Sequence, residues 1–260
     1  MRPAFRHRPR VSRRGFLAGA AASVSLTAAG RRAAATSRPV LFIGDSMVGG
    51  AFGLFLERRL AASGYVVVRD GRPSTGLARP DFFDWFARAR QLVDEHRPYA
   101  TLVMFGGNDA QGLFVGSKGA PAWIRWHEPG WAETYAERVG RLADLLLEGG
   151  ARLGWIGMPP MGKGRLGGRM VRLNRIYRAE MAIRPRARFV DIWDVLADRR
   201  GRYAARLPVG PGGRRVRVRA GDDVHLTVAG ARYLAAEVEP RLASVLAPAK
   251  GGAPPRSADG

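Results

Sequence analysis

The sequence predicts an α/β fold in which helices cover both faces of a parallel sheet. Short apolar runs alternate with longer amphipathic segments along most of the chain, which is the order of repeated strand–helix units. The apolar runs are continuous, as expected for strands that are buried on both faces. The chain has 260 residues and is 46% apolar, which is enough for one domain with a sizeable core.

The strands are predicted from short apolar runs rich in branched and aromatic side chains. In chain order they are Val40–Ile43, Tyr65–Arg69, Thr101–Phe105, Leu153–Gly157 and Arg188–Val190. The helices are predicted from apolar residues spaced three or four apart, such as Tyr135, Val139 and Leu142. They are Phe52–Ala62, Phe82–Glu95, Trp131–Glu148, Met170–Met181 and a last helix from about Val228 to Val245.

Two segments interrupt this alternation. Residues 110–130 form a long connection with several aromatic side chains, and loops of this length in compact domains are usually functional. Residues 202–219 are predicted to form a small hairpin that turns at Pro211-Gly212-Gly213. The segment 247–260 is rich in Pro, Gly, Ala and Ser and is expected to be a disordered tail.

The N-terminal residues have the order of an export signal. A basic stretch containing Arg13-Arg14 precedes a weakly apolar stretch, Phe16–Ala29, and then the cleavage-like run Ala33-Ala34-Ala35. This order resembles a bacterial twin-arginine signal peptide, so we expect residues 1–35 to engage the twin-arginine export machinery. The mature protein would then be periplasmic or extracellular after cleavage near Ala35.

The charge and cysteine content narrow the functional classes. The net charge is +21, and removing residues 1–35, which hold eight arginines and no acid, leaves +13. Such a surface attracts polyanions, but the arginines are spread through every segment and no nucleic-acid-binding motif is present. We therefore expect no specific nucleic acid partner; a solvated basic surface and a polyanion site both remain open. The absence of cysteine excludes disulfides and a cysteine nucleophile.

Three loops expected at the carboxyl edge of the sheet carry the side chains of an acyl-transfer site. The first strand runs into Gly44-Asp45-Ser46, and the third runs into Gly106-Gly107-Asn108-Asp109. Asp222-Asp223-Val224-His225 lies just before the last helix. Ligands of open parallel sheets bind at this edge. A hydroxyl, a carboxamide and an imidazole beside a carboxylate are therefore expected to meet there.

Ser46 and His225 are the candidate nucleophile and base. Serine needs a base at neutral pH, and a neutral imidazole whose other nitrogen faces a carboxylate is suited to this role. Of the other three histidines, His7 lies in the expected signal, His96 at a helix end and His127 in the long connection. Only His225 follows a carboxylate by three residues in a loop that opens a helix.

These blocks resemble the SGNH branch of the GDSL hydrolases. Block one of that family matches Phe42-Ile43-Gly44-Asp45-Ser46, block three matches Gly106-Gly107-Asn108-Asp109, and block five matches Asp222-Asp223-Val224-His225. The glycine of block two is best matched by Gly76, with Gly71 as the alternative, because the asparagine that usually precedes it is absent. The resemblance covers roughly residues 39–246.

The resemblance implies a three-layer α/β/α sandwich with a flavodoxin-like, five-stranded parallel sheet over residues 36–246. It also implies that Ser46 attacks an ester carbonyl, that His225 is the base and that Asp222 orients His225, with Asp223 as a rival. The Ser46 N–H, the Gly76 N–H and the Asn108 side chain would form the oxyanion hole.

Neither a metal nor a cofactor is expected. No common zinc or Walker motif occurs. Gly162-Lys163-Gly164-Arg165-Leu166-Gly167 fits a dinucleotide fingerprint in spacing, but four residues separate it from the preceding strand, where the motif needs its first glycine. We interpret this string as a loop at the rim of the site. Asp45 and Asp109 are interpreted as structural acids that bond nearby backbone N–H groups.

We therefore expect an exported serine esterase that acts on an O-acyl ester, with O-acetyl groups of a cell-envelope polysaccharide as the hypothesis for the substrate. Trp123 and Trp126 are the candidate sugar-binding residues, because indoles stack on sugar faces; loop packing is the competing interpretation. Two alternatives remain: an O-acyltransferase that uses the same triad, and a catalytically silent glycan-binding protein on this scaffold.

Overall fold

The computed structural model describes residues 39–117, 122–162 and 164–247. The expected signal peptide, residues 1–35, lies outside the described residues. The same is true of the expected C-terminal tail after Ala247. Within the described ranges, no helix combines the length and the apolar character needed to cross a membrane.

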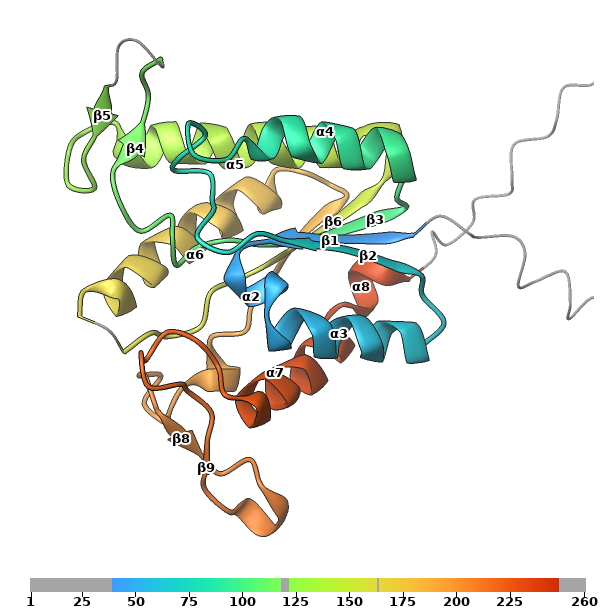
Figure 1. The fold of residues 1–260 in the computed structure, drawn as a ribbon, viewed down its shortest axis with the longest axis vertical. Helices are drawn as coiled ribbons and strands as arrows, with labels where there is room; N and C mark the ends of the chain where they lie inside the picture. Colours follow the sequence, from blue (N-terminus) through green and yellow to red (C-terminus); the bar gives the residue numbers. More distant parts are fainter. Residues whose placement is uncertain (1–38, 118–121, 163, 248–260) are drawn as a thin grey trace, which may run out of the picture. The chain divides into compact units, whose positions relative to one another are not determined.

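A five-stranded parallel sheet forms the centre of the domain (Figure 1). Its strands are β1 (Val40–Gly44), β2 (Val67–Gly71), β3 (Ala100–Met104), β6 (Arg152–Ile156) and β7 (Ala187–Val190). They are arranged in the order β2-β1-β3-β6-β7, which is the flavodoxin-like order. The chain moves outward from β1 to β2 and then crosses back to β3, so the direction of winding changes beside β1. The predicted fold class is confirmed.

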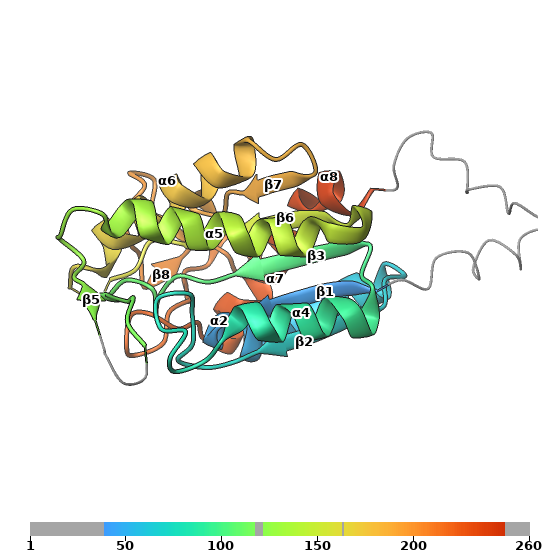
Figure 2. The ribbon, with the colours of Figure 1, turned by 90° about the horizontal axis from the view of Figure 1, so that it is seen from above.

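Helices cover both faces of the sheet. One layer contains α3 (Ala51–Ala62), α7 (Val228–Arg241) and the short α8 (Ala243–Leu246), and the other contains α4 (Trp85–His96), α5 (Trp131–Leu147) and α6 (Leu166–Ala182). In the second layer α5 packs between α4 and α6 (Figure 2). All residues of β1 and β3 are buried, which explains their continuous apolar runs.

The helix ends follow local capping chemistry. Helix α4 begins at Trp85, three residues later than predicted, because the Asp84 carboxylate caps it by accepting hydrogen bonds from two backbone N–H groups. The same helix ends where Arg97 adopts a left-handed conformation before Pro98. The predicted last helix is divided into α7 and α8 next to Pro240, which lacks the backbone donor that a helix interior needs.

Two hairpins lie outside the main sheet. Strands β8 (Arg206–Leu207) and β9 (Val216–Arg217) pair antiparallel, with the 3₁₀ turn η3 (Pro211–Gly213) between them, so the hairpin predicted within 202–219 is present. The 110–130 connection contains a second hairpin, β4 (Leu113–Phe114) with β5 (Trp123–Ile124), that the sequence did not predict.

Candidate active site

Ser46 lies at the carboxyl end of β1, beside the point where the sheet changes its direction of winding. It is the first residue of the short helix α2 (Ser46–Gly49), and the preceding Asp45 caps that helix by accepting a hydrogen bond of 2.9 Å from the Met47 N–H. Burial raises the pKa of Asp45 to about 7. The role expected for Asp45, bonding nearby backbone N–H groups, agrees with this geometry.

A continuous hydrogen-bonded chain joins Ser46, His225 and Asp222. The Ser46 hydroxyl lies 2.9 Å from His225 Nε2, and His225 Nδ1 lies 2.6 Å from Asp222 Oδ2. The second contact assigns the proton to Nδ1, which leaves Nε2 free to accept the serine proton. The hydrogen bond from His225, helped by backbone N–H groups of the loop, holds the pKa of Asp222 well below its usual range. Asp222 is therefore ionised and oriented toward the imidazole.

Asp223, the sequence-based rival, makes different contacts. Its backbone is left-handed, with φ of 60°, and its carboxylate accepts a hydrogen bond of 2.6 Å from the Tyr203 hydroxyl. Its carbonyl oxygen accepts a hydrogen bond from the Gly162 N–H. Asp223 thus holds the shape of the loop, and Asp222 is the carboxylate that faces the imidazole.

Asn108 and Gly76 lie on two loops that are hydrogen-bonded to each other. Asn108 lines the same cavity as Ser46, whereas Gly76 is not part of that lining. The Asn108 side-chain N–H donates a 3.0 Å hydrogen bond to the Thr75 carbonyl oxygen, which ties the loop after β3 to the loop after β2. Gly76 is buried, and a Cβ atom at its position would lie 2.2 Å from Asp109 Oδ1. Gly71, the alternative, lies in β2, where a Cβ atom would lie 2.0 Å from the Gly49 nitrogen. Gly71 therefore serves close packing between β2 and α2.

A buried polar network supports the Gly76 loop. Asp109 is fully buried and accepts hydrogen bonds of 2.7 Å from the Ala78 N–H and from the Tyr135 hydroxyl. The Tyr135 hydroxyl also lies 2.9 Å from that of Tyr177. Burial raises the pKa of Asp109 to about 6. Asp109 is structural, as expected, but its carboxylate accepts from a backbone N–H of the neighbouring loop and from a hydroxyl on α5, 31 and 26 residues away in sequence.

Two buried arginines that the sequence did not single out hold the Gly76 loop and the His225 loop. Arg138 donates to the carbonyl oxygens of Leu77 (2.8 Å) and Ala78 (3.2 Å). Arg219 is fully buried and donates to the carbonyl oxygens of Val224 (2.9 Å) and Pro160 (2.5 Å). Burial lowers the pKa of Arg219 to about 10. Nothing in the local sequence distinguishes these two arginines from the many on the surface.

The loops that carry Ser46, Asn108 and His225 surround one cavity of about 380 Å³. Ser46, Asn108 and His225 line it, and the other lining side chains are mostly apolar: Met47, Pro73, Met158, Met161, Leu166 and Val224. This volume lies near the lower end of the range typical of small-molecule sites. The His225 and Asp222 side chains are 48% and 43% exposed, so water has access to the imidazole.

The two tryptophans do not line this cavity. Trp126 is only 8% exposed, and its ring lies against Trp131 and beneath the guanidinium groups of Arg169 and Arg172. Its faces are covered, so the prediction that Trp126 stacks on a sugar is wrong, and its role is in packing. Trp123 is 46% exposed on β5, where one ring contact is with Arg79.

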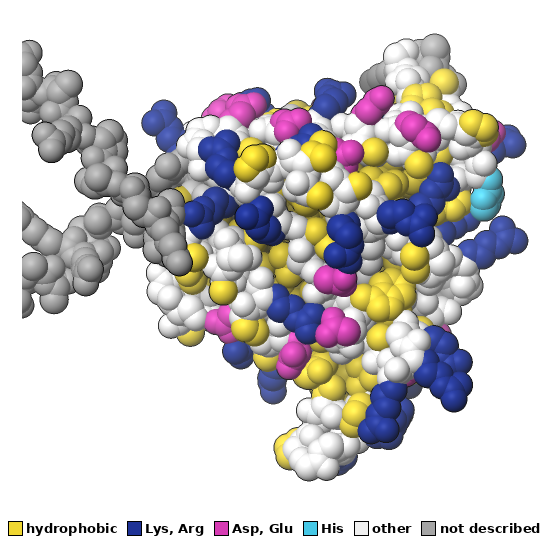
Figure 3. All heavy atoms as spheres, turned by 180° about the vertical axis from the view of Figure 1, so that it is seen from behind, with side chains coloured by type: hydrophobic (Ala, Val, Ile, Leu, Met, Phe, Trp, Pro, Cys, Tyr) yellow, Lys and Arg dark blue, Asp and Glu magenta, His cyan; other side chains and the backbone are white. Residues whose placement is uncertain are grey.

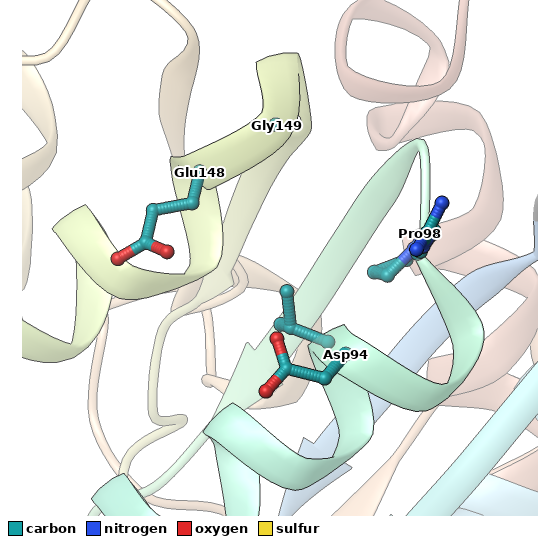
Figure 4. Close-up of a pocket in the computed structure, with 6 residues that line it drawn as sticks. Asp94, Pro98, Glu148 and Gly149 are labelled. Atoms are coloured by element: carbon teal, nitrogen blue, oxygen red, sulfur yellow. The ribbon is translucent and has the colours of Figure 1, made fainter.

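A second, larger cavity of about 690 Å³ lies where α4 and α5 end, and its lining includes none of Ser46, Asn108 and His225. Asp94 and Glu148 project at its rim, and Pro98 and Gly149 complete it (Figure 4). Its lining includes no serine or histidine, so it lacks the groups that acyl transfer needs. No cluster of three or more metal-ligating side chains occurs among the described residues.

Solved structures with a similar architecture include SGNH and GDSL proteins. A candidate SGNH hydrolase from Slackia heliotrinireducens aligns with a TM-score of 0.54 at 16% identity, over 80% of this chain and 100% of that one. A GDSL-like lipase from Bacteroides thetaiotaomicron aligns with a TM-score of 0.51 at 15% identity, over 83% and 94%. A variant of an acetyl-xylooligosaccharide esterase from Geobacillus gives 0.52 at 18% identity, over 80% and 94%.

The protein therefore has an SGNH/GDSL hydrolase-like fold. It belongs to the family described as "Protein of unknown function (DUF459)", which matches residues 39–241. No curated protein matches the sequence significantly.

Proposed function

We propose that this protein is a serine esterase that hydrolyses a short O-acyl ester, with Ser46 as nucleophile, His225 as base and Asp222 as the group that orients the base. The observation that carries the proposal is the unbroken chain from the Ser46 hydroxyl through the His225 ring to the Asp222 carboxylate, with contacts of 2.9 and 2.6 Å. These distances fit direct proton transfer from the serine to the imidazole.

The reaction follows from these positions. Ser46 Oγ attacks the ester carbonyl carbon while its proton moves to His225 Nε2, and the carbonyl oxygen becomes an oxyanion. The backbone N–H groups of Ser46 and Gly76 and the Asn108 amide would stabilise that oxyanion. The ester C–O bond then breaks, and the alkoxide takes the proton from His225. Water attacks the acyl-enzyme with the same base, which releases the acid and restores the serine.

The cavity supports a short acyl group. Its volume is about 380 Å³ and its walls are mostly apolar. Among the wall residues, the Met158 and Met161 side chains are almost completely buried. Thioether side chains adapt to small apolar groups such as an acetyl methyl.

The exposure of the triad favours hydrolysis over acyl transfer. An acyltransferase must keep water away from its acyl-enzyme, whereas the His225 side chain here is about half exposed. We therefore propose water as the acceptor.

We further propose that the protein acts outside the cytoplasm on an acylated envelope polysaccharide. The twin-arginine-like order of residues 1–35 supports export. The exposed Trp123 indole supports a sugar-containing substrate, and one protein of similar fold is described as an acetyl-xylooligosaccharide esterase.

The proposal is tested by p-nitrophenyl acetate hydrolysis with purified protein. Ser46→Ala is expected to lower kcat/KM by at least about 10³-fold with an unchanged melting temperature. The matched control is Ser244→Ala, because Ser244 is exposed on α8. Asn108→Ala should reduce kcat by about 10²-fold with little change in KM. A Ser46→Ala protein as active as wild type would remove the proposed nucleophile.

A further inference from the structure

A cleft of about 840 Å³ lies between the β8–β9 hairpin and the 3₁₀ turn η2 (Asp194–Leu196). We call it the arginine cleft, because five arginines line it together with Tyr233: Arg199, Arg200, Arg202, Arg206 and Arg215. Lys and Arg side chains gather beside the hairpin that projects at the bottom of the space-filling view (Figure 3). The arginine cleft is thus a concave, positively charged part of the surface.

Most of this positive charge has no neutralising partner. The two acidic residues of the cleft are already paired, Asp194 with Arg241 at 2.7 Å and Asp198 with Arg202 at 3.2 Å. The guanidinium groups of Arg199, Arg200, Arg206 and Arg215 make no ion pair with any described residue, and all four side chains belong to exposed residues. Exposed guanidinium groups that line one cleft without ion-pair partners attract anions and bind carboxylates or sulfates in a bidentate manner.

The surroundings of the cleft favour one class of polyanion. Apolar anchors strengthen binding to a lipid surface, and exposed aromatic rings, on which bases stack, strengthen binding to single-stranded nucleic acid. The exposed large hydrophobic residues of the described chain are Val66, Phe82, Val115, Trp123, Val171, Ile183 and Val228, and none lies within 194–217. A linear chain of acidic sugars needs neither feature.

The cleft is connected to the catalytic loop. Strand β9 ends at Arg217, five residues before Asp222. Tyr203 donates its hydroxyl hydrogen bond to Asp223, and Arg219 donates to the Val224 carbonyl oxygen. A polymer held by the cleft is therefore bound by the same segment that carries His225.

We propose that the arginine cleft binds an anionic polysaccharide, a linear polymer whose sugars carry carboxylate or sulfate groups. That this polymer carries the ester cleaved at Ser46 rests on the proposed function; the binding itself does not. Of the two interpretations of the basic surface that the sequence left open, this proposal favours a polyanion site.

The test measures binding of polygalacturonate to the purified full-length protein by titration calorimetry at low and at higher sodium chloride concentration. We expect binding that weakens steeply with salt, and no binding of neutral dextran. The cleft variant combines Arg199→Gln, Arg200→Gln, Arg206→Gln and Arg215→Gln. The control variant loses the same charge at four exposed arginines elsewhere: Arg58, Arg141, Arg175 and Arg188.

The cleft variant is expected to bind polygalacturonate at least about tenfold more weakly than the control variant, with both retaining the wild-type melting temperature. Equal weakening in the two variants would overturn the proposal, because only net charge would then matter. Tighter binding to single-stranded DNA or to phosphatidylglycerol vesicles than to polygalacturonate would overturn the choice of polymer. Binding without ester cleavage by the wild type would contradict the proposed esterase alone.

Discussion

Replacing Gly76 by alanine tests how the proposed oxyanion hole is held. An alanine Cβ at this position would lie 2.2 Å from Asp109 Oδ1, about 0.8 Å closer than real Cβ contacts allow. The carboxylate cannot withdraw easily, because it is fixed by 2.7 Å hydrogen bonds from the Ala78 N–H and the Tyr135 hydroxyl. The Gly76 loop must therefore move instead, and its N–H moves with it.

A shift of this size is large on the scale of catalysis. A displacement of about 1 Å can cost about 100-fold in rate, similar to the removal of one oxyanion donor. We expect Gly76→Ala to lower kcat on p-nitrophenyl acetate by about 10²-fold with little change in KM. Overpacking should also reduce the free energy of unfolding by about 1–3 kcal/mol, so the melting temperature is measured in parallel.

The matched control is Gly168→Ala. Gly168 lies in α6, where a Cβ atom meets nothing within 4 Å, so this substitution should leave kcat unchanged and stabilise the helix by about 1 kcal/mol. A folded Gly76→Ala protein with kcat within about threefold of wild type would refute the reasoning, since the donor would then tolerate displacement.

Three further predictions concern pH dependence, packing and export. Burial raises the pKa of Asp109 to about 6, so the native state keeps a proton that the unfolded chain loses, and its stability falls as pH rises from about 4 to about 6. Over this pH range the free energy of unfolding, measured with urea, should fall by about 3 kcal/mol less in Asp109→Asn than in the wild type. Parallel plots of unfolding free energy against pH for the two proteins would contradict this prediction. Trp126→Ala should destabilise the fold by about 3 kcal/mol and Trp123→Ala by less than about 1 kcal/mol, measured by the same method; equal losses would contradict the burial argument. Arg13→Lys combined with Arg14→Lys should leave unprocessed precursor in the cytoplasm on cell fractionation, whereas normal export would exclude the twin-arginine route.

The centre of the sheet could be predicted because β1 and β3 are buried along their whole length and are therefore uninterrupted apolar runs. The edge strand β2 is mostly half-buried and includes Arg69 and Asp70, and it begins two residues later than predicted. The helix start at Trp85 was missed because capping by Asp84 outweighs the apolar character of Phe82, which is 61% exposed. The β4–β5 hairpin was missed because strands of two residues are too short to show a periodic pattern.

The candidate triad was predicted from spacing. Asp222 and His225 are three residues apart in one loop, and Ser46 directly follows a strand and a capping acid. The roles of these residues can therefore be inferred from their local sequence. The supporting residues lack such a signal. Arg138 and Arg219 are buried only because distant carbonyl oxygens converge on them. Trp126 is likewise buried by contacts made only in the folded chain.

The central claim is that the Ser46 hydroxyl is an activated nucleophile, and covalent labelling tests it without knowledge of the substrate. A fluorophosphonate reacts with an activated serine by forming an O–P bond and releasing fluoride. The wild-type protein should gain one adduct by intact mass, mapped by peptide sequencing to Ser46, and labelling should be at least about 10²-fold slower in His225→Ala. An unlabelled wild-type protein, or an adduct at another serine, would contradict the account.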